Sequence, residues 1–140
     1  MKKIVLLLVV IVGVGCGAGR TATISEAQTW RMFDADKSLI FDSIRLFATK
    51  EEFKLLRFDE DAGRILGHTS VADTMEHRSR VIMMAMAITQ MDSVRCVVDA
   101  RFNFANEKEP SDVRSKRMLS VYYGRLFEHL SARFKLDPMN

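Results

Sequence analysis

The chain lacks the short motifs that usually identify an enzyme. It has no G-x-S-x-G sequence for a serine nucleophile, no Gly-rich loop for a phosphate and no H-E-x-x-H pair for zinc. It also lacks a basic tract or a stripe of alternating basic and aromatic residues, which a nucleic-acid-binding surface would show. We therefore expect a protein that is not an enzyme, uses no cofactor and has no nucleic-acid partner.

A long hydrophobic run is missing as well. The uncharged apolar run at residues 4–14 is well short of the roughly 20 residues that a helix needs to cross the hydrocarbon core of a membrane. Lys2 and Lys3 precede this run, and the small residue Gly15 follows it, directly before Cys16. This order of basic, apolar and small residues is that of a secretory signal. We expect export of the chain rather than a transmembrane anchor.

The Gly-Cys junction at the end of this run resembles the lipobox of bacterial lipoproteins. In that family the cysteine receives a diacylglyceryl thioether, the signal is removed and the new amino terminus is acylated. The resemblance implies a signal peptide over residues 1–15 and lipid attachment at Cys16, because several acyl chains together anchor a protein stably. It departs from the family pattern at Gly13, where the family favours leucine. The alternative is an ordinary signal cut slightly later, near Gly17 or Ala18.

The lipoprotein resemblance also implies a location and a partner. Glycine rather than aspartate after the cysteine implies the outer membrane, facing the periplasm, in a cell that has one. The partner would be the membrane itself, to which the lipid anchor would attach the protein. A further partner protein in the envelope is also expected. The mature chain would be nearly neutral, because the formal charge of +3 includes the two lysines of the signal, and it would keep one free thiol, Cys96. Without an intramolecular disulfide, packing must stabilise the fold.

The remaining residues divide into a tether and a domain. Residues 16–28 comprise the predicted lipidated cysteine and a flexible tether of small and polar side chains. Residues 29–140 are enough for a single domain with its own core. A short first strand is expected over residues 29–35, because Trp30 and Met32 alternate with Arg31 and Phe33. A helix is expected to follow, with Asp36 as its N-cap.

Two hairpins and a last helix complete the domain. The first hairpin turns at Gly63, which can adopt a positive φ. In the second, residues 79–90 are apolar on both faces, Met91 and Asp92 form the turn, and residues 93–104 alternate with Val94 and Cys96 on the core side. Pro110 and Ser111 are expected to open a helix with a wide apolar stripe.

The predicted fold is α+β. An antiparallel sheet of four to five strands packs against two helices in the order β-α-β-β-β-β-α. This order resembles that of helix-grip domains in several envelope proteins, including lipoprotein subunits of outer-membrane assembly machinery. The resemblance is one of element order alone, so no residue role is carried over from it.

Three groups of residues could carry chemistry, and each also has a structural interpretation. Met84 and Met86 lie on one side of a strand and could bind Cu(I), although methionine packs irregular cores well and we favour that role. His68, Asp73, Glu76 and His77 fall between two strands and could surround a divalent metal, but a solvated loop is the favoured interpretation. Cys96 could be a nucleophile, with His129 among its candidate bases, but it is expected to face the core, and His129 to lie at the rim of the helix stripe.

Trp30 and Tyr122 are the candidates for an interaction surface, since large amphipathic rings are favoured at interfaces. The strand over residues 79–90 offers a further argument, because one of its two apolar faces must be covered by another part of the chain or by a partner. The leading hypothesis is a lipid-anchored envelope protein that binds another protein without catalysis. The alternative is a periplasmic module that binds a small molecule or copper in the cleft between the sheet and the long helix.

Overall fold

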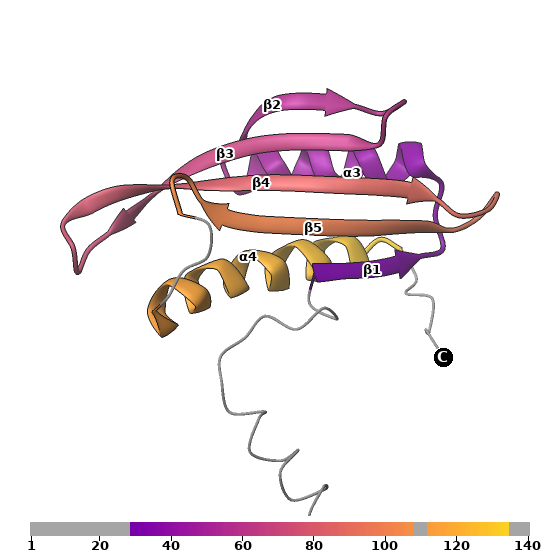
Figure 1. The fold of residues 1–140 in the computed structure, drawn as a ribbon. Coiled ribbons are helices and arrows are strands. Elements are labelled where there is room, and N and C mark those ends of the chain that lie inside the picture. The colour runs from indigo at the N-terminus through magenta and orange to yellow at the C-terminus, as the bar shows by residue number, and fades with distance from the viewer. Residues whose placement is uncertain (1–28, 108–111, 135–140) are drawn as a thin grey trace, which may run out of the picture.

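The computed structural model describes residues 29–107 and 112–134 (Figure 1). Cys16, with the predicted signal and tether, lies outside the described residues. The elements are strand β1 (Trp30–Phe33), helix α3 (Lys37–Lys50), strands β2 (Lys54–Asp59), β3 (Arg64–Asp73), β4 (Arg78–Gln90) and β5 (Cys96–Phe104), and helix α4 (Val113–Ser131). The predicted α+β class and the order β-α-β-β-β-β-α are confirmed.

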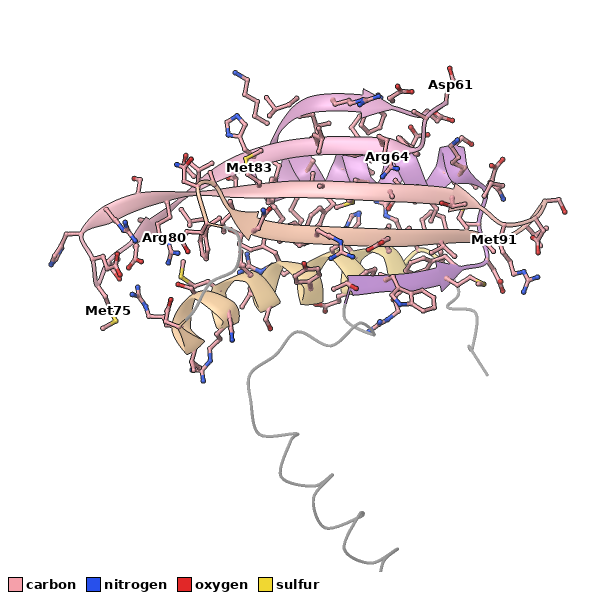
Figure 2. All side chains as sticks on the ribbon, in the orientation of Figure 1. Asp61, Arg64, Met75, Arg80, Met83 and Met91 are labelled. Carbon is pink, nitrogen blue, oxygen red and sulfur yellow. The ribbon has the colours of Figure 1, made fainter. Side chains whose placement is uncertain are left out.

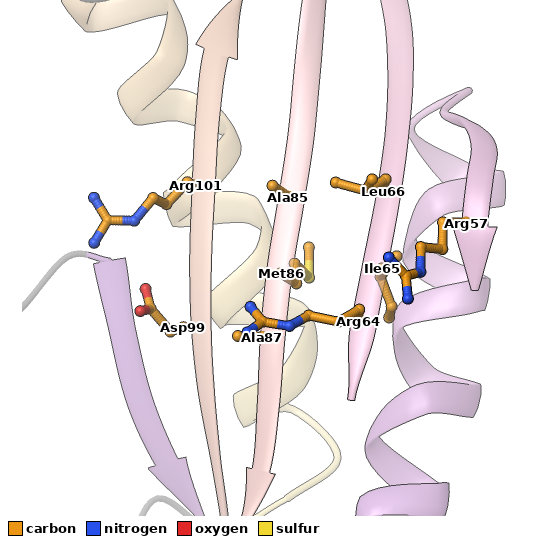
Figure 3. Close-up of a pocket in the computed structure, with 9 residues that line it drawn as sticks. All are labelled: Arg57, Arg64, Ile65, Leu66, Ala85, Met86, Ala87, Asp99 and Arg101. Atoms are coloured by element: carbon orange, nitrogen blue, oxygen red, sulfur yellow. The ribbon is translucent and has the colours of Figure 1, made fainter. Parts of the chain in front are cut away.

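The five strands form one antiparallel sheet in the order β1-β5-β4-β3-β2. Strands β2 to β5 are neighbours in chain order. Strand β1 forms the edge of the sheet beside β5, with Trp30 opposite Asp99. Both helices lie on the same side of the sheet, as the close-up in Figure 3 shows, where they stand behind the strands. The domain therefore has two layers, and the sheet has an inner face toward the helices and an outer face.

The hydrophobic core fills the space between the inner face and the helices. On β4 every second residue from Ile82 to Ile88 is buried, and on β5 the same holds from Cys96 to Phe104. Each large apolar side chain taken out of water contributes about 1.5–3 kcal/mol to the free energy of folding. The helices supply the other wall of the core, with buried Ile40, Phe41, Ile44, Phe47 and Ala48 from α3 and Leu119, Tyr123, Leu126, Phe127 and Leu130 from α4.

The first hairpin turns as the sequence predicts. Gly63 has a φ of +66°, in the left-handed region that glycine occupies without strain. The turn also docks on β4, because the amide of Ile88 donates a 2.8 Å hydrogen bond to the carbonyl of Gly63. A Cβ at position 63 would lie 2.2 Å from the carbonyl oxygen of Ile88. The position therefore requires glycine for both its dihedral angle and its closeness to β4.

The second hairpin has a longer turn than predicted. The connection spans residues 91–95 instead of Met91 and Asp92 alone, and Val94 is 61% exposed instead of facing the core. The carboxylate of Asp92 accepts hydrogen bonds from the amide of Val94 and from Arg95, and the Met91 amide donates to the Arg95 carbonyl. These local bonds close a wider turn. Val94 has the sequence spacing of a core-facing residue of β5, but it belongs to this turn.

The two helices begin differently. Asp36 precedes α3 as predicted, but its side chain makes no capping bond, and the Lys37 amide instead donates to the side chain of Gln90 at 2.9 Å. Helix α4 is capped by Asp112, whose carboxylate accepts a 2.8 Å bond from the Ser115 amide. Pro110 and Ser111, the predicted start of this helix, lie outside the described residues. Among the helices described, none has the length and apolar character to cross a membrane.

Candidate functional site

The outer face of the sheet is covered by neither helix of the described part of the chain. On β4 its residues are Val81, Met83, Ala85, Ala87 and Thr89, which alternate with the buried residues of the core. The sequence predicted that this strand is apolar on both faces, and the structure confirms that one of those faces lies away from the helices. Val81 on β4 is 36% exposed, and Leu66, which pairs with Ala85 from β3, is 38% exposed.

A shallow hollow of about 200 Å³ lies on this face (Figure 3). Ala85 and Ala87 form its floor, because their short side chains leave the middle of β4 lower than its neighbours. The strand pairing places Leu66, Ala85 and Arg101 in one cross-strand row, and Arg64, Ala87 and Asp99 in the next. Arg57 on β2 lines the same hollow. Three guanidinium groups and one carboxylate therefore surround an apolar floor.

The arginines of the hollow are not equally engaged. Arg57 pairs with Asp59 at 3.3 Å, and Asp59 also accepts a hydrogen bond from the Ala62 amide. The Ala62 amide has the larger effect and Arg57 the smaller, and together they hold the pKa of the Asp59 carboxyl below its usual range. Arg64 and Arg101, by contrast, make no hydrogen bond or ion pair with any residue in the described ranges. Their charges are free to meet a partner.

Asp99 is the one acidic group inside the hollow. One of its carboxylate oxygens is buried and has no hydrogen-bond partner in the described chain. Figure 3 shows Arg64 extending from β3 across β4 in the direction of Asp99, but no ion pair joins them.

The two predicted interface residues lie on different faces. Trp30 pairs with Asp99 across the β1–β5 ladder, so it stands half-buried on the outer face, next to the hollow. Tyr122 is half-buried on the helix side, where its ring packs 5.6 Å from Phe53 and 5.8 Å from Phe102. Burial raises the pKa of its hydroxyl. Only Trp30 is brought to the candidate surface.

The methionine pair and the histidine cluster are not assembled into exposed sites. Met84 and Met86 are buried in the core on the helix side, at 0% and 3% exposure, and Met83 is the methionine of this strand that stands on the outer face. His68 lies within β3, not in a loop, since that strand continues to Asp73. In residues 29–107 and 112–134 no three His, Cys, Asp or Glu side chains converge in a way that could hold a metal ion.

Asp73 belongs to a buried ionic cluster that sequence reasoning missed. Its side chain is fully buried, lies 3.6 Å from the guanidinium of Arg80 and accepts a close hydrogen bond from Arg114. The bond from Arg114 chiefly holds the pKa of Asp73 below its usual range. Arg80 also donates to Ser115 at 2.8 Å and to Glu107 at 3.1 Å. An arginine within an otherwise apolar strand was the signal in the sequence.

This cluster ties the far end of the sheet to the start of α4. Figure 2 shows Arg80 below the end of β3 and β4, which projects beyond the other strands with Met75 at its tip. We name residues 70–81 the ribbon end, because here β3 and β4 pair only with each other: β2 pairs with β3 as far as His68, and β5 pairs with β4 as far as Ile82. The cluster has a structural role in holding this end.

Cys96 and His129 lie where the sequence predicts. Cys96 is buried, and burial raises the pKa of its thiol to about 11, far from the value that a nucleophile needs. His129 is half-buried beside the helix stripe, with one ring nitrogen 2.9 Å from the carbonyl oxygen of Ser43. Tyr123 is buried, and its hydroxyl accepts a 2.9 Å bond from the Phe102 amide.

A second hollow, of about 420 Å³, lies between β1 and α4. Gly124 lies at its side, and nothing stands within 4 Å of where a Cβ would be. The guanidinium of Arg31 forms the opposite side and lies 5.1 Å from the centre of the Phe127 ring. No methionine lines this hollow, which is bounded by Arg31, Ser120, Tyr123, Gly124, Phe127, Glu128 and Ser131.

No protein-family model matches this chain, and no curated protein matches its sequence. The chain is similar in structure to the adenylate sensor of AMP-activated protein kinase, solved in complex with the nucleotide ZMP, at a TM-score of 0.50 and 9% identity, over 69% of this chain and 93% of that one. It is also similar to a TBP-like protein from Parabacteroides distasonis, at a TM-score of 0.43 and 14% identity, over 79% of this chain and 98% of that one. At 9% identity the similarity to the adenylate sensor concerns the fold alone. Nothing is inferred from the TBP-like protein, because its TM-score is below 0.5. The helix-grip resemblance stays a prediction.

Proposed function

We propose that this protein is a lipid-anchored bacterial envelope lipoprotein that binds a protein partner through the outer face of its sheet. In this proposal Cys16 carries the lipid, residues 17–28 tether the domain, and the domain acts by binding and not by catalysis. The proposed location is the outer membrane, with the domain in the periplasm.

The observation that supports this proposal is the composition of the outer face. It combines partly exposed apolar side chains of β3 and β4 with arginines, and one tryptophan stands at its edge. Arginine, methionine and aromatic residues are enriched in protein interfaces, whereas lysine is depleted there. The side chains concerned are Trp30, Arg57, Arg64, Leu66, Val81, Met83 and Arg101.

Site-specific crosslinking in living cells tests the proposed surface. A photoreactive amino acid is placed at Met83, on the outer face, in the full chain. The matched control places it at Val121, which is 43% exposed on the helix side. Crosslinks to one defined protein from position 83 and none from position 121 support the proposal. Equal labelling from both positions, or none from either, refutes it.

The anchor is tested separately by the intact mass of the protein purified from membranes. A chain that starts at Cys16 and carries acyl chains is expected, and this form should be absent from a Cys16→Ser variant. A chain cut without acylation near Gly17 would remove the anchor from the proposal. The binding surface would then belong to a free exported domain.

A second candidate function is the binding of a small molecule between the sheet and α4. The hollow beside Gly124 is the observation in its favour. Titration with a panel of small metabolites should raise the melting temperature if this function is correct, because a ligand that binds only the native state stabilises it. The same titration of a Gly124→Leu variant, which fills the hollow, is the control.

A further inference from the structure

The hollow on the outer face has an excess of positive charge that the described chain does not neutralise. Arg64 and Arg101 are unpaired there, Arg57 is shared with Asp59, and Asp99 is the single acidic group within the hollow. A second copy of this chain would bring the same positive excess against itself, so charge disfavours a symmetric dimer through this face. Charge complementarity instead favours an acidic occupant.

The type of cation favours a protein segment over a membrane surface. A guanidinium group binds a carboxylate through two parallel hydrogen bonds, which gives geometric selectivity. The unpaired cations here are arginines that stand beside an apolar floor, not a field of protruding lysines. The carboxylate of Asp99 within the hollow would also repel a uniformly anionic surface. A partner with separate negative charges can avoid that repulsion.

The spacing of the two arginines specifies the partner further. Arg64 and Arg101 are on strands that flank β4, and their rows are two residues apart, so their Cα atoms are roughly 12 Å apart along a diagonal. This diagonal passes over Ala85 and Ala87. In an extended segment, residues i and i+4 lie on the same side and about 13 Å apart, with residue i+2 midway between them.

We propose that the outer face binds an extended acidic segment with carboxylates at positions i and i+4 and an apolar side chain at i+2. The two carboxylates pair with Arg64 and Arg101. The side chain of Arg64, which crosses β4 in Figure 3, turns toward its carboxylate, and the apolar side chain of the segment occupies the hollow above Ala85 and Ala87. This proposal rests on the proposed function and names the chemistry of its partner.

The chain contains its own reporter for the test. Trp30 is the single tryptophan, and it stands on the outer face opposite Asp99. Its fluorescence in the full chain, purified in detergent, follows a titration with a peptide containing Glu-Ser-Val-Ser-Glu. The comparison peptides contain Lys-Ser-Val-Ser-Lys and Glu-Glu-Ser-Val-Ser. We expect saturable binding of the first peptide, weaker binding of the peptide with adjacent glutamates, and none of the lysine peptide.

Charge variants separate a local site from a general attraction of the acidic peptide, because only charges at the hollow should matter. Arg64→Gln and Arg101→Gln should each weaken binding of the first peptide about two- to fivefold, and together about tenfold. Asp99→Asn should strengthen it about two- to threefold, because a like charge is removed. Arg117→Gln, an equal change of charge at an exposed position of α4, should leave binding unchanged. Urea midpoints close to that of the wild type confirm that each variant is folded.

Several outcomes overturn the acidic-segment proposal. These are equal binding of the acidic and basic peptides, an Arg117→Gln effect as large as that of Arg64→Gln, and a higher affinity for phosphatidylglycerol vesicles than for the peptide. Crosslinking from position 83 separates this failure from that of the proposed function. If the crosslinks persist in the double arginine variant, the proposed protein-binding surface is kept and the proposal of an acidic partner is rejected. If they are absent from the wild type, both proposals fall.

Discussion

Replacing Gly63 by alanine tests the contact between the first hairpin and β4. The substitution adds one methyl group at a position with φ +66°, where the Cβ would lie 2.2 Å from the carbonyl oxygen of Ile88. The atom in the way is backbone, so no side-chain rotation can relieve the clash. Either the hairpin or β4 must move, and the 2.8 Å bond from the Ile88 amide to the Gly63 carbonyl is then lost.

The expected loss of stability is a sum of two contributions. A non-glycine residue in the left-handed conformation costs about 1–2 kcal/mol. Losing the hydrogen bond between buried groups costs about another 1–3 kcal/mol. We therefore expect Gly63→Ala to reduce the free energy of unfolding by about 3 kcal/mol. With a typical urea dependence of about 1.5 kcal/mol per M, the unfolding midpoint should fall by about 2 M.

The same substitution at Gly124 is the matched control. This residue lies in α4, and nothing stands within 4 Å of its added Cβ, so Gly124→Ala should stabilise the helix by about 1 kcal/mol. Both variants are compared by urea unfolding, followed through circular dichroism and Trp30 fluorescence. A Gly63→Ala midpoint within about 0.3 M of the wild type would show that the hairpin is not packed against β4 as described.

Three further predictions concern buried polar groups. The pKa of Asp73 is lowered in the folded state, so its contribution to stability is present above its unfolded pKa, near 3.8, and is lost as the pH falls through the folded pKa. In an acid titration, the free energy of unfolding should therefore fall less steeply for Asp73→Asn than for the wild type. The pKa of Cys96 is raised from 9.0 to about 11, so its contribution is full below pH 9.0 and falls as the pH rises toward about 11. A Cys96→Ala variant should lack this alkaline loss, and a thiol reagent at neutral pH should label the wild type only after urea is added. Tyr123→Phe should cost about 1–2 kcal/mol in a thermal melt, because the Phe102 amide loses its acceptor, whereas equal melting temperatures would show that water replaces the hydroxyl.

Periodicity predicted the order of the elements because each one has a clear apolar pattern. The stripe of α4 and the alternation of β5 are visible without a structure, and Gly63 marks its turn by its place between two strand patterns. The turn at residues 91–95 was misplaced because Val94 continues the alternation of β5. The polar bonds of Asp92 decide that turn, and a hydrophobicity pattern does not register them.

The candidate site could be predicted only in part. The double apolar face of β4 indicated that a surface would be left over, and Trp30, a candidate for an interaction surface, lies on that face. The hollow could not be predicted, because Arg64, Ala87 and Asp99 come together only through the register of three strands. The ionic cluster was hidden for a similar reason, since Asp73 and Arg114 are 41 residues apart in sequence.

The ribbon end gives the domain a second level of cooperativity. A ribbon of two strands has little stability of its own in water, and here the outermost residues are fastened by Asp73, Arg80 and Arg114 more than by the core. Amide protons of residues 70–81 should therefore exchange with solvent through a local opening that releases this end while the rest of the sheet stays closed. The free energy of that opening would depend on ionic strength and on pH, whereas amide exchange in the middle of β4 would require global unfolding. One continuous strand, β4, thus belongs to two foldons, one governed by charge and the other by hydrophobic burial.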